Sequence, residues 1–179
     1  MPLTLVKRLI LHRTILSFDL IEQRTGHTME TGIGKFCVHN VVTVTRKSSI
    51  IEAATLMRQH HVGALVIVEE TRAGTLPVGV LTDRDVVVEI VAAGLSPETM
   101  TVGEIVDRPV ITVREDAGYA ETVRRMSVGG VRRVPVVDAQ GALVGIITID
   151  DMLHQLAGPL LALAELAGRE RHLEPGTRR

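Results

Sequence analysis

The hydrophobic and polar positions follow two alternating periods along the chain. Short runs of β-branched and other aliphatic residues, typical of buried strands, are separated by longer stretches in which apolar residues recur every three or four positions, as in helices. Two of the strand-like runs are joined by a short loop containing Gly74, which predicts an antiparallel hairpin. The predicted order is strand, helix, strand, strand, helix, over residues 41–44, 49–61, 63–68, 76–82 and 83–94.

Local signals mark where the two predicted helices begin and end. Ser49-x-x-Glu52 has the spacing of a capping box at the start of the first helix. Gly94 is a typical stop signal for the second. The three consecutive valines at 86–88 are poor helix formers, so the second helix needs tertiary burial to hold it.

The whole pattern occurs twice. When the sequence is shifted by 69 positions, residues 34–68 lie over 103–137 with apolar type kept nearly throughout. The shift then falls to 66, because the hairpin loop of the first copy is longer. A repeated unit usually cannot bury its apolar face alone. The predicted parts are a loosely ordered N-terminal extension, two repeats, and a C-terminal helix with a polar tail, over residues 1–31, 32–94, 101–157 and 158–179.

The first 28 residues differ from the rest. They carry Lys7, Arg8 and Arg13 among aliphatic residues, and their apolar run is too short for the core of a signal peptide. One hypothesis is that the natural start is Met29. No apolar run in the chain reaches the roughly 18–20 residues that a membrane span needs.

Composition excludes several classes of function. With 20 basic and 21 acidic residues the net charge is −1, which gives no reason to expect nucleic acid as the main partner. Aromatic residues are 2% of the chain, so a base-stacking platform is not expected. The single cysteine, Cys37, cannot form an intrachain disulfide and suits a reducing cytoplasm. We interpret it as a small buried hydrophobe.

The two copies repeat one turn, "GVLTDRD" at 79–85 and "GIITIDD" at 145–151. Each places a threonine and an aspartate, Thr82 with Asp85 and Thr148 with Asp151, where a strand gives way to a helix. A carboxylate at a helix N-terminus can accept both hydrogens of a ribose diol, and a threonine hydroxyl can bond a phosphate or a ribose oxygen. The same spacing is also a capping box that needs no ligand.

This repeated plan, the block "TVREDAGYAETVRRMSVGGVRRVPVVD" and the G-h-h-[ST]-x-x-[DN] turns resemble a pair of cystathionine-β-synthase (CBS) domains over about residues 32–156. The resemblance implies an α/β fold in which two β-α-β-β-α repeats form a disc-like module with a pseudo-twofold axis. It also implies clefts for an adenosine compound, such as AMP, ADP, ATP or S-adenosylmethionine. Such modules usually regulate another protein and form homodimers through the helices that follow each cleft, here "DVVVEIV" and "MLHQLA".

Further ligand contacts follow from the resemblance. Basic residues at Arg132 and Arg133 would reach phosphates, and their equivalents in the first copy are Gly63 and Ala64, so one cleft should prefer phosphorylated ligands. The alternative is a solvated basic pair at a strand end. Arg84 is either a further phosphate contact or a surface charge partner. Four aliphatic residues would sandwich the adenine: Val41, Val62, Val110 and Val131.

Two other functions are weighed against this hypothesis. One is a structural dimerisation module whose clefts hold no nucleotide. The other is an enzyme, but we find no Ser/His/Asp set, P-loop or dinucleotide fingerprint, and hence no catalytic cofactor is expected. His60 and His61 point about 100° apart on a helix and lack a third ligand, so no metal site is predicted.

Overall fold

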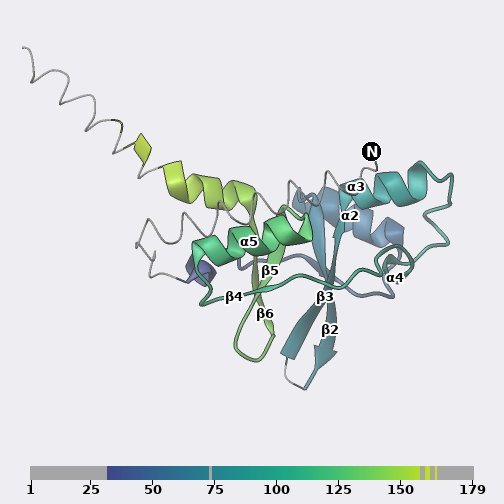
Figure 1. Cartoon of the computed structure of the whole chain (residues 1–179). Coiled ribbons are helices and arrows are strands. Elements are labelled where there is room, and N and C mark those ends of the chain that lie inside the picture. Colours follow the sequence, from purple (N-terminus) through teal and green to yellow (C-terminus); the bar gives the residue numbers. More distant parts are fainter. Residues whose placement is uncertain (1–31, 73, 158–159, 162–163, 165–179) are drawn as a thin grey trace, which may run out of the picture.

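The computed structural model describes residues 32–72, 74–157, 160–161 and 164. The predicted order of elements occurs twice (Figure 1). The first copy consists of β1 (Thr43–Val44), α2 (Ile50–His60), β2 (Ala64–Thr71), β3 (Gly74–Thr82), α3 (Asp83–Asp85) and η2 (Val86–Val91). The second consists of β4 (Val113–Arg114), α5 (Tyr119–Gly129), β5 (Arg133–Val137), β6 (Leu143–Thr148) and a helix over 149–157. Two short helices that the pattern did not predict precede the copies: η1 (Ile33–Lys35) and α4 (Val102–Ile105).

The strands form two three-stranded sheets, in the orders β1-β2-β3 and β4-β5-β6. In each sheet the short first strand pairs parallel with the second, and the second pairs antiparallel with the third, as the hairpin prediction requires. The register is also repeated. Val44 lies opposite Ile67 in the first sheet, and their equivalents Val113 and Val136 lie opposite each other in the second.

The predicted first helix begins where its capping signal stands. Ser49 Oγ accepts a hydrogen bond of 3.1 Å from the Glu52 N–H, and the helix ends on His61 in the left-handed conformation.

The prediction of one regular helix over 83–94 is wrong. Three α-helical residues are followed by the π-helix η2, in which the Ala92 N–H donates to the Val87 carbonyl five residues back. The departure falls on the run of valines, whose branched side chains crowd the preceding turn of an α-helix. The turn that follows contains Gly94, with a φ of 67°.

The residues that precede each copy pack against the other copy. We call residues 33–38 and 102–107 the lead-in segments. Gly34 donates its N–H to the Glu115 carbonyl, and its equivalent Gly103 donates to the Arg46 carbonyl, each at 2.9 Å. The exchange is therefore reciprocal, and it follows the same 69-residue shift as the sequence repeat.

Each lead-in segment completes the hydrophobic core of the opposite copy. Val102 and Val106 lie in the core of the first copy, while Ile33 and Cys37 lie in that of the second. Cys37 is buried, as predicted, and burial raises the pKa of its thiol above the ordinary value. Burying one such aliphatic side chain contributes about 1.5–3 kcal/mol to the free energy of folding. The stability of each copy therefore depends on the lead-in segment of the other.

Close packing explains the glycine that begins each repeated turn. A Cβ on Gly145 would overlap Cys37 Sγ and lie 2.9 Å from the Val38 carbonyl oxygen. A Cβ on Gly79 would lie 3.3 Å from Cγ1 of Val106, the equivalent of Cys37. These glycines admit the lead-in segments, which agrees with the predicted close passage of the chain.

The predictions for residues 1–31, including a start at Met29, and for most of 158–179 lie outside the described residues. Within the described part of the chain, no helix is long and apolar enough to cross a bilayer.

Candidate ligand site

The two repeated turns adopt the same geometry. Asp85 Oδ2 accepts hydrogen bonds from the Thr82 N–H at 2.9 Å and the Thr82 hydroxyl at 2.6 Å, and the Asp85 N–H donates back to Thr82 Oγ1. Asp151 Oδ2 accepts from the Thr148 N–H at 2.9 Å and its hydroxyl at 2.7 Å, with the same return bond. Both turns are thus complete capping boxes, the structural interpretation that the sequence left open.

The capping bonds use only one oxygen of each carboxylate. All of them end on Oδ2, and no residue in the described part of the chain bonds Oδ1 of Asp85 or Asp151. Both aspartates are half-buried. A carboxylate has about four lone-pair sites, so each has room to accept ribose hydroxyls without giving up its cap.

Residues from the first copy lie beside the Thr148–Asp151 turn. Val38 and Ile146 exchange two backbone hydrogen bonds of 2.9 and 3.0 Å, which places the lead-in segment two residues below Thr148. His39 follows, with Nδ1 3.2 Å from the Val144 carbonyl oxygen. The chain then turns into Val41, which is half-buried at the start of the first strand.

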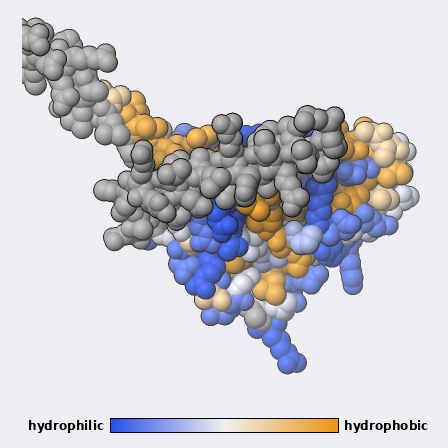
Figure 2. All heavy atoms as spheres, in the orientation of Figure 1, coloured by the Kyte–Doolittle hydropathy of each residue, from blue (hydrophilic) through white to orange (hydrophobic). Residues whose placement is uncertain are grey.

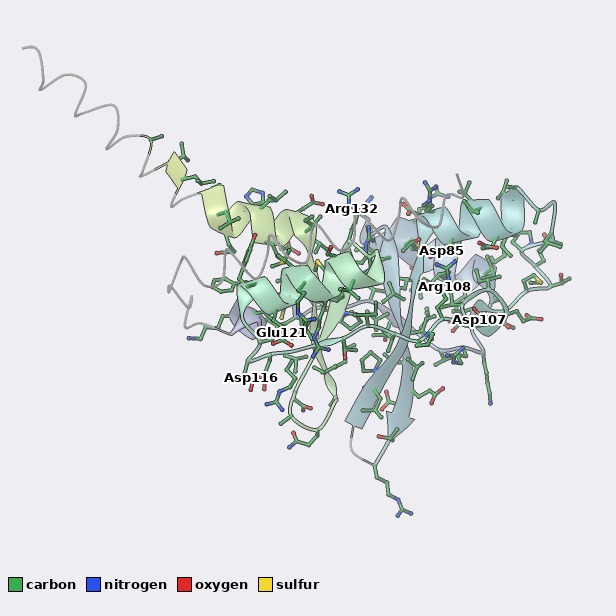
Figure 3. The ribbon with its side chains drawn as sticks, viewed as in Figure 1. Asp85, Asp107, Arg108, Asp116, Glu121 and Arg132 are labelled. Atoms are coloured by element: carbon green, nitrogen blue, oxygen red, sulfur yellow. The ribbon has the colours of Figure 1, made fainter. Side chains whose placement is uncertain are left out.

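Residues from the second copy lie beside the Thr82–Asp85 turn. The Arg133 guanidinium reaches across from β5, and its Nη1 lies 3.8 Å from where a Cβ on Gly63 would stand. Asp83 Oδ2 lies 3.1 Å from the same point. Figure 3 shows Arg108 and Arg132 on the same side of the molecule as Asp85. Basic side chains of the second copy therefore lie on the same side of the molecule as the Thr82–Asp85 turn.

The other predicted contacts are placed as follows. Arg132 is exposed, and its carbonyl accepts a 2.9 Å hydrogen bond from the Ile149 N–H. Arg84 is exposed too, and its side chain has no bonding partner among the described residues. The four aliphatic residues predicted to hold adenine are all half-buried: Val41, Val62, Val110 and Val131. Val62 packs against the core of the first copy, and Val131 packs against the core of the second.

Sequence reasoning missed Arg46 and Arg108. Neither belongs to the repeated turn. Arg108 follows the lead-in segment 102–107 and lies on the Asp85 side of the molecule, and Arg46 bonds that segment through the Val106 carbonyl. The available signal was a difference between the copies, because the equivalents of these residues, Glu115 and His39, have other chemistry.

The helices after the two turns expose apolar side chains. Val87, Val88 and Val91 of η2 are 46–67% exposed, and Leu153 is 57% exposed on the helix over 149–157. Figure 2 shows hydrophobic surface at both places. These are the helices that the sequence predicts as dimer faces.

Two β-α-β-β-α copies that exchange their lead-in segments, each with a Thr–Asp turn, define a tandem module of the CBS type. A CBS domain family model matches residues 33–92 and 102–158, and the chain belongs to this family. CBS pairs are regulatory modules.

Relatives of known sequence support the assignment. A protein of Methanopyrus kandleri is 38% identical over 121 residues, which cover 68% of this chain and 60% of that protein. Hypoxic response protein 1 of Mycobacterium tuberculosis is 38% identical over 117 residues, which cover 65% of this chain and 78% of that protein. The chain thus spans less than two thirds of the archaeal relative.

Solved structures show the same fold. The crystal structure of Hypoxic Response Protein I with two coordinated zinc ions has a TM-score of 0.60 and 35% identity, and covers 69% of this chain and 98% of that one. The CBS domain pair of protein MJ0100, in complex with 5′-methylthioadenosine and S-adenosyl-L-methionine, has a TM-score of 0.62 and 30% identity, and covers 72% and 98%. In the present chain, no group of three or more His, Cys, Asp or Glu side chains among the described residues is arranged to hold a metal.

Proposed function

We propose that this protein is a non-enzymatic regulatory module that binds an adenosine compound at its two Thr–Asp turns and signals to another protein. The observation that carries the proposal is the Oδ1 of each capping aspartate, which no residue in the described ranges bonds and which has the same geometry in both copies. That oxygen is suited to accept ribose hydroxyls. The complex of the MJ0100 domain pair with two adenosine compounds supports this ligand class.

The two sites differ in the ligand charge they favour. The Asp85 site has the Arg133 guanidinium within reach, whose planar fork suits a phosphate. The Asp151 site has Gly63 and Ala64 at the equivalent positions. We therefore expect AMP, ADP or ATP at the Asp85 site and a less charged adenosine compound at the other. Competition between AMP and ATP at the first site would make the protein a reporter of cellular energy state.

We further propose that the protein forms homodimers through the exposed faces of η2 and of the helix over 149–157. These faces present Val91 and Leu153 to solvent among other aliphatic side chains. Exposed apolar patches on a small protein commonly mark association sites. Val91→Glu combined with Leu153→Glu should convert a dimer into a monomer in sedimentation velocity, and an unchanged sedimentation coefficient would contradict this assignment.

Calorimetric titration with AMP and with S-adenosylmethionine tests the ligand sites. Asp85→Asn and Asp151→Asn keep an oxygen that can accept the capping N–H bond but remove the charge. A hydrogen bond to a charged group contributes about 1.5–3 kcal/mol, so each variant should weaken its own site about 10- to 100-fold. Glu121→Gln is the control, because this carboxylate pairs with Arg125 on the surface of α5 and belongs to neither turn and neither lead-in segment. If the two aspartate variants bind as tightly as the control variant, neither aspartate contacts the ligand.

A structural dimerisation module without a nucleotide is the second candidate. The observation that favours it is that both carboxylates already cap a helix. It predicts that no adenosine compound raises the thermal midpoint, whereas a ligand at 100 times its dissociation constant adds about 2.7 kcal/mol of stability. A thermal-shift series with AMP, ADP, ATP, S-adenosylmethionine and NADH separates the two functions.

A further inference from the structure

The two lead-in segments are anchored in different ways. In one half, Val38 is held to Ile146 of β6 by a reciprocal pair of backbone hydrogen bonds. The equivalent residues in the other half are Asp107 and Val80 of β3, by the 69- and 66-residue shifts. Within the described residues, these two form no backbone pair. Near its C-terminal end, the segment that leads toward the Asp85 site is therefore anchored by other contacts.

Arg46 supplies that anchor. Its Nη1 donates to the Val106 carbonyl at 3.0 Å and its Nη2 to the Val78 carbonyl at 3.4 Å. One guanidinium thus bridges the lead-in segment to β3, which a fork of fixed geometry can do and a single ammonium does poorly. Glu69 Oε1 lies 3.6 Å from Nε and adds an ion pair. That pair is solvent-exposed and contributes little by itself.

The bridge is connected to the proposed ligand site through β3 and the first core. Val78 is on β3, the strand that ends in Thr82 of the capping box. Val106 packs in the same core cluster as Val86, the residue after Asp85. The next residues, Asp107 and Arg108, lie on the Asp85 side of the molecule (Figure 3).

The second copy cannot reproduce this bridge. Glu115 stands at the position equivalent to Arg46, and a carboxylate cannot donate to a carbonyl. We propose that Arg46 is a positioning residue specific to the Asp85 site: it holds the lead-in segment 102–107 against β3 so that residues 108–110 are presented to a ligand there. The inference rests on the proposed function, because it assumes that the Asp85 turn binds a ligand.

Binding of AMP to the Asp151→Asn protein tests the proposal, since the other site is weakened in that background and the Asp85 site dominates the titration. Adding Arg46→Met should lower AMP affinity about tenfold, the effect of losing roughly 1.4 kcal/mol. Arg46→Lys should retain only part of the AMP affinity that Arg46→Met loses. Glu115→Met, the matched change in the other copy, should leave the affinity as it was. In the Asp85→Asn background, Arg46→Met should leave binding of S-adenosylmethionine unchanged.

Hydrogen exchange of the ligand-free chain provides a second readout. The Gly103 and Val106 amides are bonded within or to this segment, and they should exchange faster in Arg46→Met than in Glu115→Met, while the Gly34 and Val38 amides stay the same. Equal exchange in the two variants, or equal loss of affinity at both sites, overturns the role of Arg46. Absence of AMP and S-adenosylmethionine binding to the unmodified chain instead overturns the proposed function, whatever the exchange shows.

Discussion

The two halves of this protein are alike in their turns and unlike in what surrounds them. The capping bonds at Thr82–Asp85 and Thr148–Asp151 agree within 0.1 Å. Arg133 adjoins the first turn across the copies, whereas the positions equivalent to Arg132 and Arg133 in the first copy are Gly63 and Ala64.

This difference indicates how a duplicated fold acquires two distinct sites. The hydrogen bonds within the two Thr–Asp turns are the same in both copies. The side chain that would select a phosphate, Arg133, reaches the first turn from β5 of the opposite copy, and such a residue is free to diverge. Four predictions test this comparison of the two halves, from the packing of the lead-in segments to a surface ion pair.

The largest effect is expected from filling the space that the glycines leave. Gly145→Ala puts a Cβ against Cys37 Sγ and the Val38 carbonyl, and backbone cannot yield as a side chain can. We expect a loss of about 2–3 kcal/mol in the free energy of unfolding, at the upper end of overpacking costs. Gly79→Ala meets mainly the tip of Ile67, so it should cost less. Urea denaturation compares them.

Gly118→Ala serves as the control, because a Cβ there meets nothing within 4 Å. Cys37→Ala should relieve part of the cost of Gly145→Ala by removing the sulfur. A cost for Gly145→Ala no larger than that of Gly118→Ala would contradict the close packing described here.

The next effect concerns ligand charge. Arg133→Met should lower AMP affinity about tenfold at the Asp85 site, as expected for the loss of one charge-assisted hydrogen bond, and leave adenosine affinity nearly unchanged. Isothermal titration of both compounds gives the ratio. Lys35→Met removes a charge from η1 and is the control. A parallel loss for AMP and adenosine would mean that Arg133 supports the fold and does not contact a phosphate.

Removing the capping hydroxyls should produce smaller and equal effects. Thr82→Val and Thr148→Val each take away the acceptor for the aspartate N–H and a donor to its Oδ2. Each should lower the free energy of unfolding by about 1 kcal/mol, the usual value of an N-cap. Thermal denaturation without ligand gives both values. A cost confined to one copy would show that the two turns are not structurally equivalent.

The smallest effect lies on the surface of the second copy. Arg114 donates two hydrogen bonds to Asp116, which lower the pKa of that carboxyl below its ordinary value of 3.8. A lowered folded-state pKa gives stability that is present above the unfolded pKa and is lost as the pH falls through the folded value. Asp116→Asn should therefore be slightly less stable than the parent at pH 7, with the difference vanishing in strong acid and in high salt. A difference that persists at pH 2 would exclude this ion pair as its cause.

Because the pattern occurs twice, most strands and helices of this fold could be predicted from the sequence. Hydrophobic periodicity placed the strands and α2, and the hairpin followed from the loop at Gly74. Periodicity did not reveal the π-helix at 86–91, because apolar spacing does not report which carbonyl each amide bonds. It also could not place α4, whose four residues are too few to show a period and whose burial is provided by the other copy.

The Thr–Asp turns and several surrounding residues, Arg133 among them, were predicted as ligand contacts, but the copy that each surrounding residue would face was not. Thr82, Asp85, Thr148 and Asp151 could be found because their spacing carries a local chemical meaning. The contacts of Arg46 and Arg133 join residues that are remote in sequence, and no local pattern encodes such a pairing. In a single sequence, the only sign of these two residues is that the equivalent positions in the other copy hold different residue types.

The exchange of the lead-in segments has a consequence for biosynthesis. During translation the first copy emerges before Val102 and Val106, the buried residues that complete its core. The nascent chain must therefore wait with an unfinished hydrophobic interior until the ribosome has released the linker and the short helix beyond it. Release of that helix, and not the end of η2, sets the earliest moment at which the first half can become resistant to proteases.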